Sequence, residues 1–156
     1  MPLLALVGCN KSDKNGLEVP NIIIDKSLDI FEGLVQSQEV DRENSEDLWK
    51  VRIRSVSGAI VEFYWYQTDD SLYRIDGLSG PYDDNYDIFP GNGLYNFKSA
   101  KFAATSQLKN NDLLDWRLRI EDSFNDLWIY SLTYNENGGK ITAYVNAKNG
   151  EVLEID

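Results

Sequence analysis

The sequence predicts an α+β fold of two tandem repeats, each a helix packed on an antiparallel β-meander. A motif of tryptophan, a basic residue, an aliphatic residue, arginine and isoleucine spans 49–53 and recurs at 116–120. A strongly β-like run follows each copy of the motif at the same distance. One more β-like run comes next in each half, over 72–77 and 141–146. Three matches in the same order indicate an internal duplication.

A helix is expected at the start of each half. In the first half, Asp25 can serve as the N-cap. It precedes apolar residues at helical spacing, namely Leu28, Phe31, Leu34 and Val35. In the second half, Asn96 can cap a helix whose apolar residues are Phe97, Ala100, Ala104 and Leu108. The expected boundaries are therefore 22–80 for the first repeat and 96–156 for the second.

The strands alternate in the way that half-buried strands do. Trp49, Val51 and Ile53 are expected on one face, with basic side chains between them on the other. Arg117 and Arg119 repeat this charged face in the second half, where Trp116 should also pack against a helix. Such a sheet buries one face under its helix and leaves the other to solvent or to a partner.

The composition excludes several classes of function. A net charge of -11 argues against nucleic acid as a partner, because phosphate binding needs clustered Lys and Arg. The chain has no histidine and a single cysteine, so it lacks Ser-His and Cys-His pairs and the usual structural zinc ligands. Carboxylate pairs occur mainly in predicted turns, where they are solvated. We therefore expect no cofactor and no enzymatic activity, with a carboxylate-based glycan hydrolase as the least favoured alternative.

The N-terminus indicates a lipid anchor. The segment Leu6-Val7-Gly8-Cys9 resembles the bacterial lipobox, in which a signal peptidase cuts before the cysteine. The resemblance implies a signal-peptide remnant over 1–9, lipid on Cys9, a polar tether over 10–21, and membrane attachment in the bacterial cell envelope, periplasmic or surface-exposed. The alternative is a first strand or a frayed terminus in which Cys9 is an ordinary small residue.

The C-terminal segment resembles the PepSY type of repeat. Residues 145–153, Val-Asn-Ala-Lys-Asn-Gly-Glu-Val-Leu, are similar to the closing "V-D-A-x-T-G-E-V-L" hairpin of such domains. The resemblance covers 96–156 and reaches 22–80 only through the internal repeat. It extends to tandem PepSY-like lipoproteins and to the repeats of β-lactamase-inhibitory protein. It implies a non-catalytic binding or inhibitory module in the envelope, without transferable active-site residues.

The stretch 81–95 is interpreted as an acidic, aromatic linker loop between the repeats. Asp83, Asn85 and Asp87 imitate the first half of a calcium loop, which makes them a weak calcium candidate. Ile88 stands where glycine would make the turn, and no glutamate closes the site. A linker is therefore favoured over a metal site.

Five aromatic residues are the candidates for partner contact: Tyr64, Tyr66, Tyr82, Tyr86 and Phe89. Aromatic side chains supply large contact areas with few rotatable bonds. Ordinary core and cross-strand packing is the alternative. The leading hypothesis is a lipid-anchored, non-catalytic envelope module that binds a secreted or envelope protein, and its more specific form is an inhibitor or chaperone of a secreted protein. The alternative function is a structural or carbohydrate-binding envelope lipoprotein.

Overall fold

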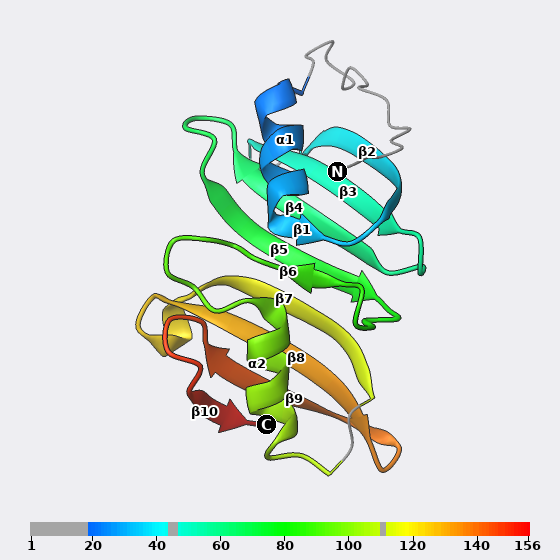
Figure 1. Cartoon of the computed structure of the whole chain (residues 1–156). Coiled ribbons are helices and arrows are strands. Elements are labelled where there is room, and N and C mark those ends of the chain that lie inside the picture. Colours follow the sequence, from blue (N-terminus) through cyan, green and yellow to red (C-terminus); the bar gives the residue numbers. More distant parts are fainter. Residues whose placement is uncertain (1–18, 44–46, 110–111) are drawn as a thin grey trace.

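A computed structural model describes residues 19–43, 47–109 and 112–156 of the chain (Figure 1). Cys9 and the segment 1–18 lie outside the described residues. Eight strands form one antiparallel sheet in the order β10-β9-β8-β7-β5-β4-β3-β2. These strands are β2 (Val35–Glu43), β3 (Leu48–Ser55), β4 (Ile60–Tyr66), β5 (Leu72–Ser79), β7 (Leu113–Glu121), β8 (Leu127–Glu136), β9 (Gly139–Asn146) and β10 (Val152–Ile155).

Two α-helices lie on the same face of this sheet (Figure 1). Helix α1 (Asn21–Ile30) contacts β3, and helix α2 (Phe97–Thr105) contacts β8 and β9. A two-stranded ribbon pairs β1 (Phe31–Glu32) with β6 (Asp87–Ile88), and a short 3-10 helix, η1 (Asp122–Phe124), precedes β8. No helix among the described residues is long and apolar enough to cross a membrane.

The predicted fold class is wrong. The described chain is mostly β, with two α-helices beside one eight-stranded sheet, rather than two separate helix-plus-meander repeats. The finding that overturns it is the pairing of β5 with β7, in which Arg74, Ile75, Asp76 and Gly77 face Arg119, Leu118, Arg117 and Trp116. A meander that ended at β5 would leave an unpaired row of backbone groups, and this pairing satisfies them. The alternation of apolar and polar residues is the same in an edge strand and in a central strand, so it does not predict this pairing.

The two helix N-termini differ in how well the sequence predicted them. The cap of α2 is confirmed, because the Asn96 side chain accepts a hydrogen bond from the Ser99 N–H at 3.1 Å. The Asp25 cap is wrong, because α1 already begins at Asn21 with Pro20 in the N-cap position. Pro20 fixes an extended backbone before the helix and makes no side-chain capping bond. Asp25 consequently lies inside α1, on its exposed side.

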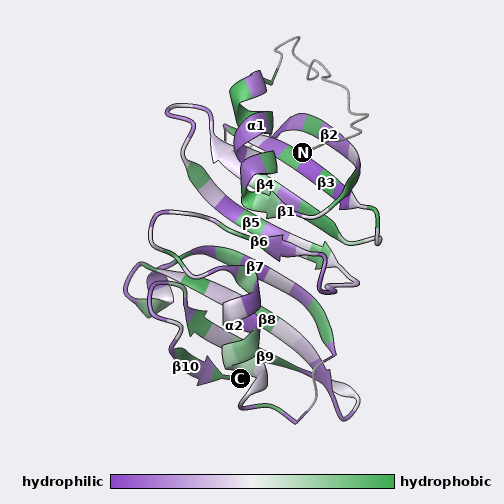
Figure 2. Cartoon of the chain, in the orientation of Figure 1, coloured by the Kyte–Doolittle hydropathy of each residue, from purple (hydrophilic) through white to green (hydrophobic). Residues whose placement is uncertain are grey.

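The core fills the space between the helices and the sheet, and hydrophobic and hydrophilic residues alternate along the strands that border it (Figure 2). Trp49 and Trp116 are both buried, as predicted. Helix α1 is tied to β4 through Ser27, whose hydroxyl accepts from the Trp65 indole N–H at 2.9 Å and donates to the Ile23 carbonyl oxygen. Each large side chain buried in this layer contributes about 2 kcal/mol or more to folding.

An aromatic cluster lies between α2, β6 and the centre of the sheet. Its ring centroids are 4.7–6.0 Å apart, and its members are Phe31, Tyr82, Tyr86, Phe97, Trp116 and Tyr130. The segment 81–95, expected as a linker, supplies two of these rings together with strand β6. It therefore packs into the core layer and pairs with β1.

Candidate functional site

The face of the sheet opposite the helices, here called the open face, carries polar side chains in rows that cross the strands. One row is continuous over all eight strands, each residue standing opposite the next: Glu39, Arg52, Glu62, Asp76, Arg117, Ser131, Tyr144 and Glu154. Five of the six arginines in the chain belong to this face, namely Arg52, Arg54, Arg74, Arg117 and Arg119. They alternate with core residues such as Val51 and Leu118.

The β3 and β4 part of the open face is built around Tyr64. The Arg52 Nε donates to Glu62 Oε2 at 2.8 Å, and the Tyr64 hydroxyl donates to Glu62 Oε1 at 2.7 Å. The Arg74 guanidinium carbon lies 4.0 Å from the centre of the Tyr64 ring. Burial, together with the bond to Glu62, raises the pKa of Tyr64 well above its usual value, so its hydroxyl stays a donor.

The ion pairs continue across β5 and β7. Asp76 accepts from two arginines, from Arg74 Nε at 3.1 Å and from Arg117 Nε at 2.9 Å. Two residues after Arg117 on β7, Arg119 Nε donates to Glu121 Oε1 at 2.8 Å. The four arginines and three carboxylates in these pairs, together with Tyr64, form the ion-pair network of the open face.

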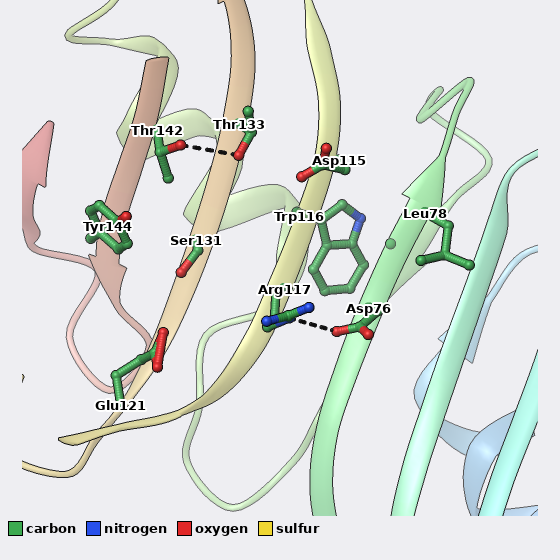
Figure 3. Close-up of a pocket in the computed structure, with 11 residues that line it drawn as sticks. Asp76, Leu78, Asp115, Trp116, Arg117, Glu121, Ser131, Thr133, Thr142 and Tyr144 are labelled. Atoms are coloured by element: carbon green, nitrogen blue, oxygen red, sulfur yellow. Dashed lines mark hydrogen bonds and ion pairs between the residues drawn. The ribbon is translucent and has the colours of Figure 1, made fainter. Parts of the chain in front are cut away.

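A groove of about 490 Å³ lies beside this network (Figure 3). Its walls come from β5, β7, β8 and β9, and its polar lining includes Asp76, Asp115, Arg117, Ser131, Thr133, Thr142 and Tyr144. The hydroxyls of Thr133 and Thr142 are 3.1 Å apart, and the ring of Tyr144 lies 5.2 Å from that of Phe124. Volumes of this size accommodate a side chain cluster or a small ligand.

The aromatic residues predicted to contact a partner do not form one surface. Tyr64 is buried under Arg74, and Tyr86 is 1% exposed within the aromatic cluster, so neither side chain is offered to a partner. Tyr82 is half-buried beside Tyr86 on the helix side of the sheet. Tyr66 is exposed at the end of β4, where its ring packs 5.2 Å from that of Tyr73. Phe89 is exposed after β6, on a different part of the molecule.

The three residues of the weak calcium candidate have separate roles. Asp83 is exposed and accepts the Asn85 N–H at 3.0 Å, which forms a local turn. Asp87 is buried, and its carboxylate accepts from the backbone N–H groups of Ile88 and Lys98 and from Asn96 Nδ2, at 2.8–3.0 Å. Within the described residues, no group of three or more His, Cys, Asp or Glu is placed to hold a metal ion. Asp87 therefore has a structural role, in which its carboxylate accepts hydrogen bonds from residues at the N-terminus of α2.

The ion-pair network was missed by sequence reasoning, although its basic half was visible. The repeated alternation at 50–54 and 117–119 indicates a charged face. Glu62 and Asp76 lie on strands other than those of Arg52 and Arg117, however, and only the register places each beside its arginine. A signal existed in Glu62, an acidic residue that interrupts the otherwise apolar and aromatic run 60–66.

No family model matches the chain, and no curated protein matches it. Among solved structures, the chain is similar to the crystal structure of a candidate lipoprotein from Clostridium difficile 630. The two are 13% identical, the alignment covers 87% of this chain and 88% of that one, and the TM-score is 0.41. A likeness at this level carries no argument about function, and the PepSY resemblance stays a prediction.

Proposed function

We propose that this chain is a non-catalytic binding module of the bacterial cell envelope that holds a protein partner on the open face of its sheet. The observation that carries the proposal is the ion-pair network on that face. The helices cover the other face, and in the described part of the chain the open face presents fixed polar groups instead of a second layer of secondary structure. Such a surface suits recognition of a partner.

The network favours binding because it is already ordered. Arg74 is held by Asp76 and by the ring of Tyr64, and Arg117 is held by the same carboxylate. Side chains that are fixed before association lose little conformational entropy on binding. The neighbouring groove adds a concave surface of about 490 Å³ that a protruding segment of a partner can enter.

The same contacts favour a non-catalytic role. The chain has no histidine, and two of the three carboxylates that line the groove, Asp76 and Glu121, are engaged by arginines. A general acid or base needs a free position beside the substrate. A more specific form of this proposal is that the module inhibits or chaperones its partner. If so, the activity of a captured enzyme should change when the module is added.

Attachment to the membrane is proposed to occur through lipid on Cys9. The support is the segment Leu6-Val7-Gly8-Cys9 followed by a polar stretch. Mass spectrometry of the mature protein should find a lipid-modified N-terminal cysteine, and Cys9→Ala should move the protein out of the membrane fraction. An unmodified chain that still begins at Met1 would refute the lipid anchor. It would not affect the proposal that the open face binds a partner.

The binding proposal is tested by locating the contact, since capture alone would not identify the face. The chain carrying Cys9→Ser is used to capture proteins from envelope and secreted extracts, and hydrogen exchange then maps the bound surface. We expect protection in β5, β7 and β8. Thr133→Trp, which fills the groove without adding charge, should abolish binding, whereas Phe102→Ser on the exposed side of α2 should not. Protection confined to α1 and α2 would refute the proposal.

A carbohydrate is the second candidate ligand, because the groove combines hydroxyl groups with an aromatic ring. Ser131, Thr133 and Thr142 line the groove together with Tyr144. Sugars are commonly bound by stacking on an aromatic face with hydrogen bonds to surrounding polar groups. Titration with envelope polysaccharides should then change tryptophan fluorescence, and Tyr144→Ala should remove the change. Saturation by a glycan with no protein contact on the open face would favour this candidate.

A further inference from the structure

We propose that four arginines of the open face form the anchor for a carboxylate-rich, extended segment of the partner protein. These arginines, called the arginine patch, are Arg52, Arg74, Arg117 and Arg119. The inference rests on the proposed function and specifies the chemistry that the partner must present. It is carried by the relative exposure of the charges, by the register of β5 and β7, and by the spacing along β7.

The arginines lie above the carboxylates that hold them. The side chains of Arg52, Arg117 and Arg119 are 40%, 44% and 35% exposed. Their partners Glu62, Asp76 and Glu121 are only 7%, 8% and 14% exposed. A molecule that approaches this part of the sheet therefore meets guanidinium groups first, although the chain as a whole carries a charge of -11.

Each guanidinium keeps hydrogen-bond donors for a ligand. In all four arginines the bond to the carboxylate is made by Nε, which is the side-on geometry. An arginine has five N–H donors, and a side-on pair with one carboxylate uses at most two of them. The outer edges of the three more exposed guanidiniums, those of Arg52, Arg117 and Arg119, can consequently bind a second carboxylate.

Within the ion-pair network, the four arginines carry one more charge than their three carboxylates balance. Arg74 on β5 stands directly opposite Arg119 on β7. Like charges at directly opposed positions of an antiparallel pair are destabilising. Asp76 serves Arg74 and Arg117 together, so the four arginines share three carboxylates. A carboxylate from outside would balance the remaining charge.

The spacing of the arginines favours an extended peptide over a single small anion. Arg117 and Arg119 are two residues apart on β7, so their Cα atoms are about 7 Å apart. That distance is also the spacing between same-side residues of an extended chain. An acidic residue at every second position of a partner segment would therefore align one carboxylate with each arginine. Arginine pairs with carboxylates in a planar, two-bond geometry that lysine does not reproduce.

The test uses a fluorescent peptide of alternating Glu and Thr, with a Gln-Thr peptide as its uncharged match. Fluorescence anisotropy with the Cys9→Ser chain should show binding of the Glu peptide only. The double variant Arg117→Gln/Arg119→Gln should weaken binding at least tenfold. Arg117→Gln alone is compared with Arg54→Gln, the matched control, because each removes one positive charge from the same face and Arg54 lies on β3, outside the patch. Arg119→Lys keeps the charge and the fold, and it should still weaken binding severalfold.

Other outcomes overturn the inference in distinguishable ways. Equal weakening by Arg54→Gln would show attraction to charge alone. Inorganic phosphate or dextran sulfate that competes as well as the Glu peptide would show a general anion site. If the peptide fails to bind while a captured partner still protects β5, β7 and β8, the proposed function stands and the arginine patch is not its anchor. If the captured partner protects only the helices, both proposals fail.

Discussion

The indole of Trp116 lies against Gly77 across the β5–β7 pair, so closely that a Cβ at position 77 would overlap the indole Nε1. On its other side the indole packs against Phe97 of α2, with ring centroids 4.7 Å apart. Trp116 thus bridges β5 and α2 in the core layer. The absence of a side chain at Gly77 is what makes this packing possible.

Gly77→Ala is therefore expected to destabilise the fold by about 1–3 kcal/mol, the usual cost of forcing extra atoms into a packed core. The measurement is the free energy of unfolding by denaturant, with tryptophan fluorescence as the probe. Gly139→Ala is the control, because a Cβ there would come no closer than 3.8 Å to its nearest neighbour, the Glu136 carbonyl oxygen. Equal stability of the two variants would contradict the packing of Trp116.

Local features of this fold were predictable from local sequence. The cap of α2 depends on one side chain and the backbone three residues later, and the sequence showed both. The alternation that buries Trp49 and exposes the basic residues around it is likewise a property of one strand. The joining of β5 to β7 was not predictable in this way, because it depends on two segments separated by β6 and α2.

Two tyrosines of the open face show the same limit of prediction from local sequence. Tyr64 and Tyr66 occupy equivalent positions on β4 and were predicted as equivalent contact residues. The structure leaves Tyr66 40% exposed and Tyr64 only 6%, because Arg74 from the next strand covers the Tyr64 ring. Nothing within the β4 sequence distinguishes the two. The difference arises from the register that sets Arg74 opposite Tyr64.

Tyr64→Phe is expected to lower stability by about 1–2 kcal/mol while keeping the ring under Arg74. The change removes the hydroxyl that donates to Glu62 at 2.7 Å, and a buried carboxylate that loses a donor is costly. Tyr66→Phe is the matched control on the same strand and face, where the exposed ring predicts a change near zero. Comparable losses in the two variants would show that the bond to Glu62 contributes nothing.

Asp87→Asn tests the carboxylate at the start of α2 through its pH dependence. Burial raises the pKa of Asp87 above its ordinary value of 3.8, despite the hydrogen bonds from the Lys98 and Ile88 N–H groups. The folded state therefore holds this proton more tightly than the unfolded chain does. The unfolded state binds fewer protons in that window, so the contribution of Asp87 to stability falls as pH rises from 3.8 through the raised pKa.

Asparagine does not titrate, so the comparison isolates this group. We expect the free energy of unfolding of the native chain, minus that of Asp87→Asn, to decrease as pH rises across the window. The variant also loses one of the two oxygens of Asp87, and the missing acceptor for Asn96 Nδ2 lowers its stability by about 1 kcal/mol. Denaturant titrations from about pH 3.5 to 7 measure both effects. A difference that rises with pH would contradict the burial of this carboxylate.

Asp76→Asn should separate the two arginines that Asp76 now holds together. Its Oδ1 pairs with Arg117 and its Oδ2 with Arg74, and the asparagine amide would present one oxygen and no charge to the two guanidiniums. Removing the charged partner of fully buried ion pairs costs about 3–5 kcal/mol. Because Arg117 is 44% exposed to solvent, which screens its charge, we expect a smaller loss of about 1–3 kcal/mol.

Salt distinguishes this electrostatic loss from a packing defect. At about 1 M salt the screening length falls to about 3 Å, which weakens the repulsion between Arg74 and Arg117. The stability difference between the native chain and Asp76→Asn should therefore shrink as salt is added. Asp115→Asn, an exposed carboxylate of the same groove, should change stability by less than about 0.5 kcal/mol at any salt concentration. A salt-independent loss at Asp76 would instead mean that its hydrogen bonds, and not its charge, hold the centre of the open face together.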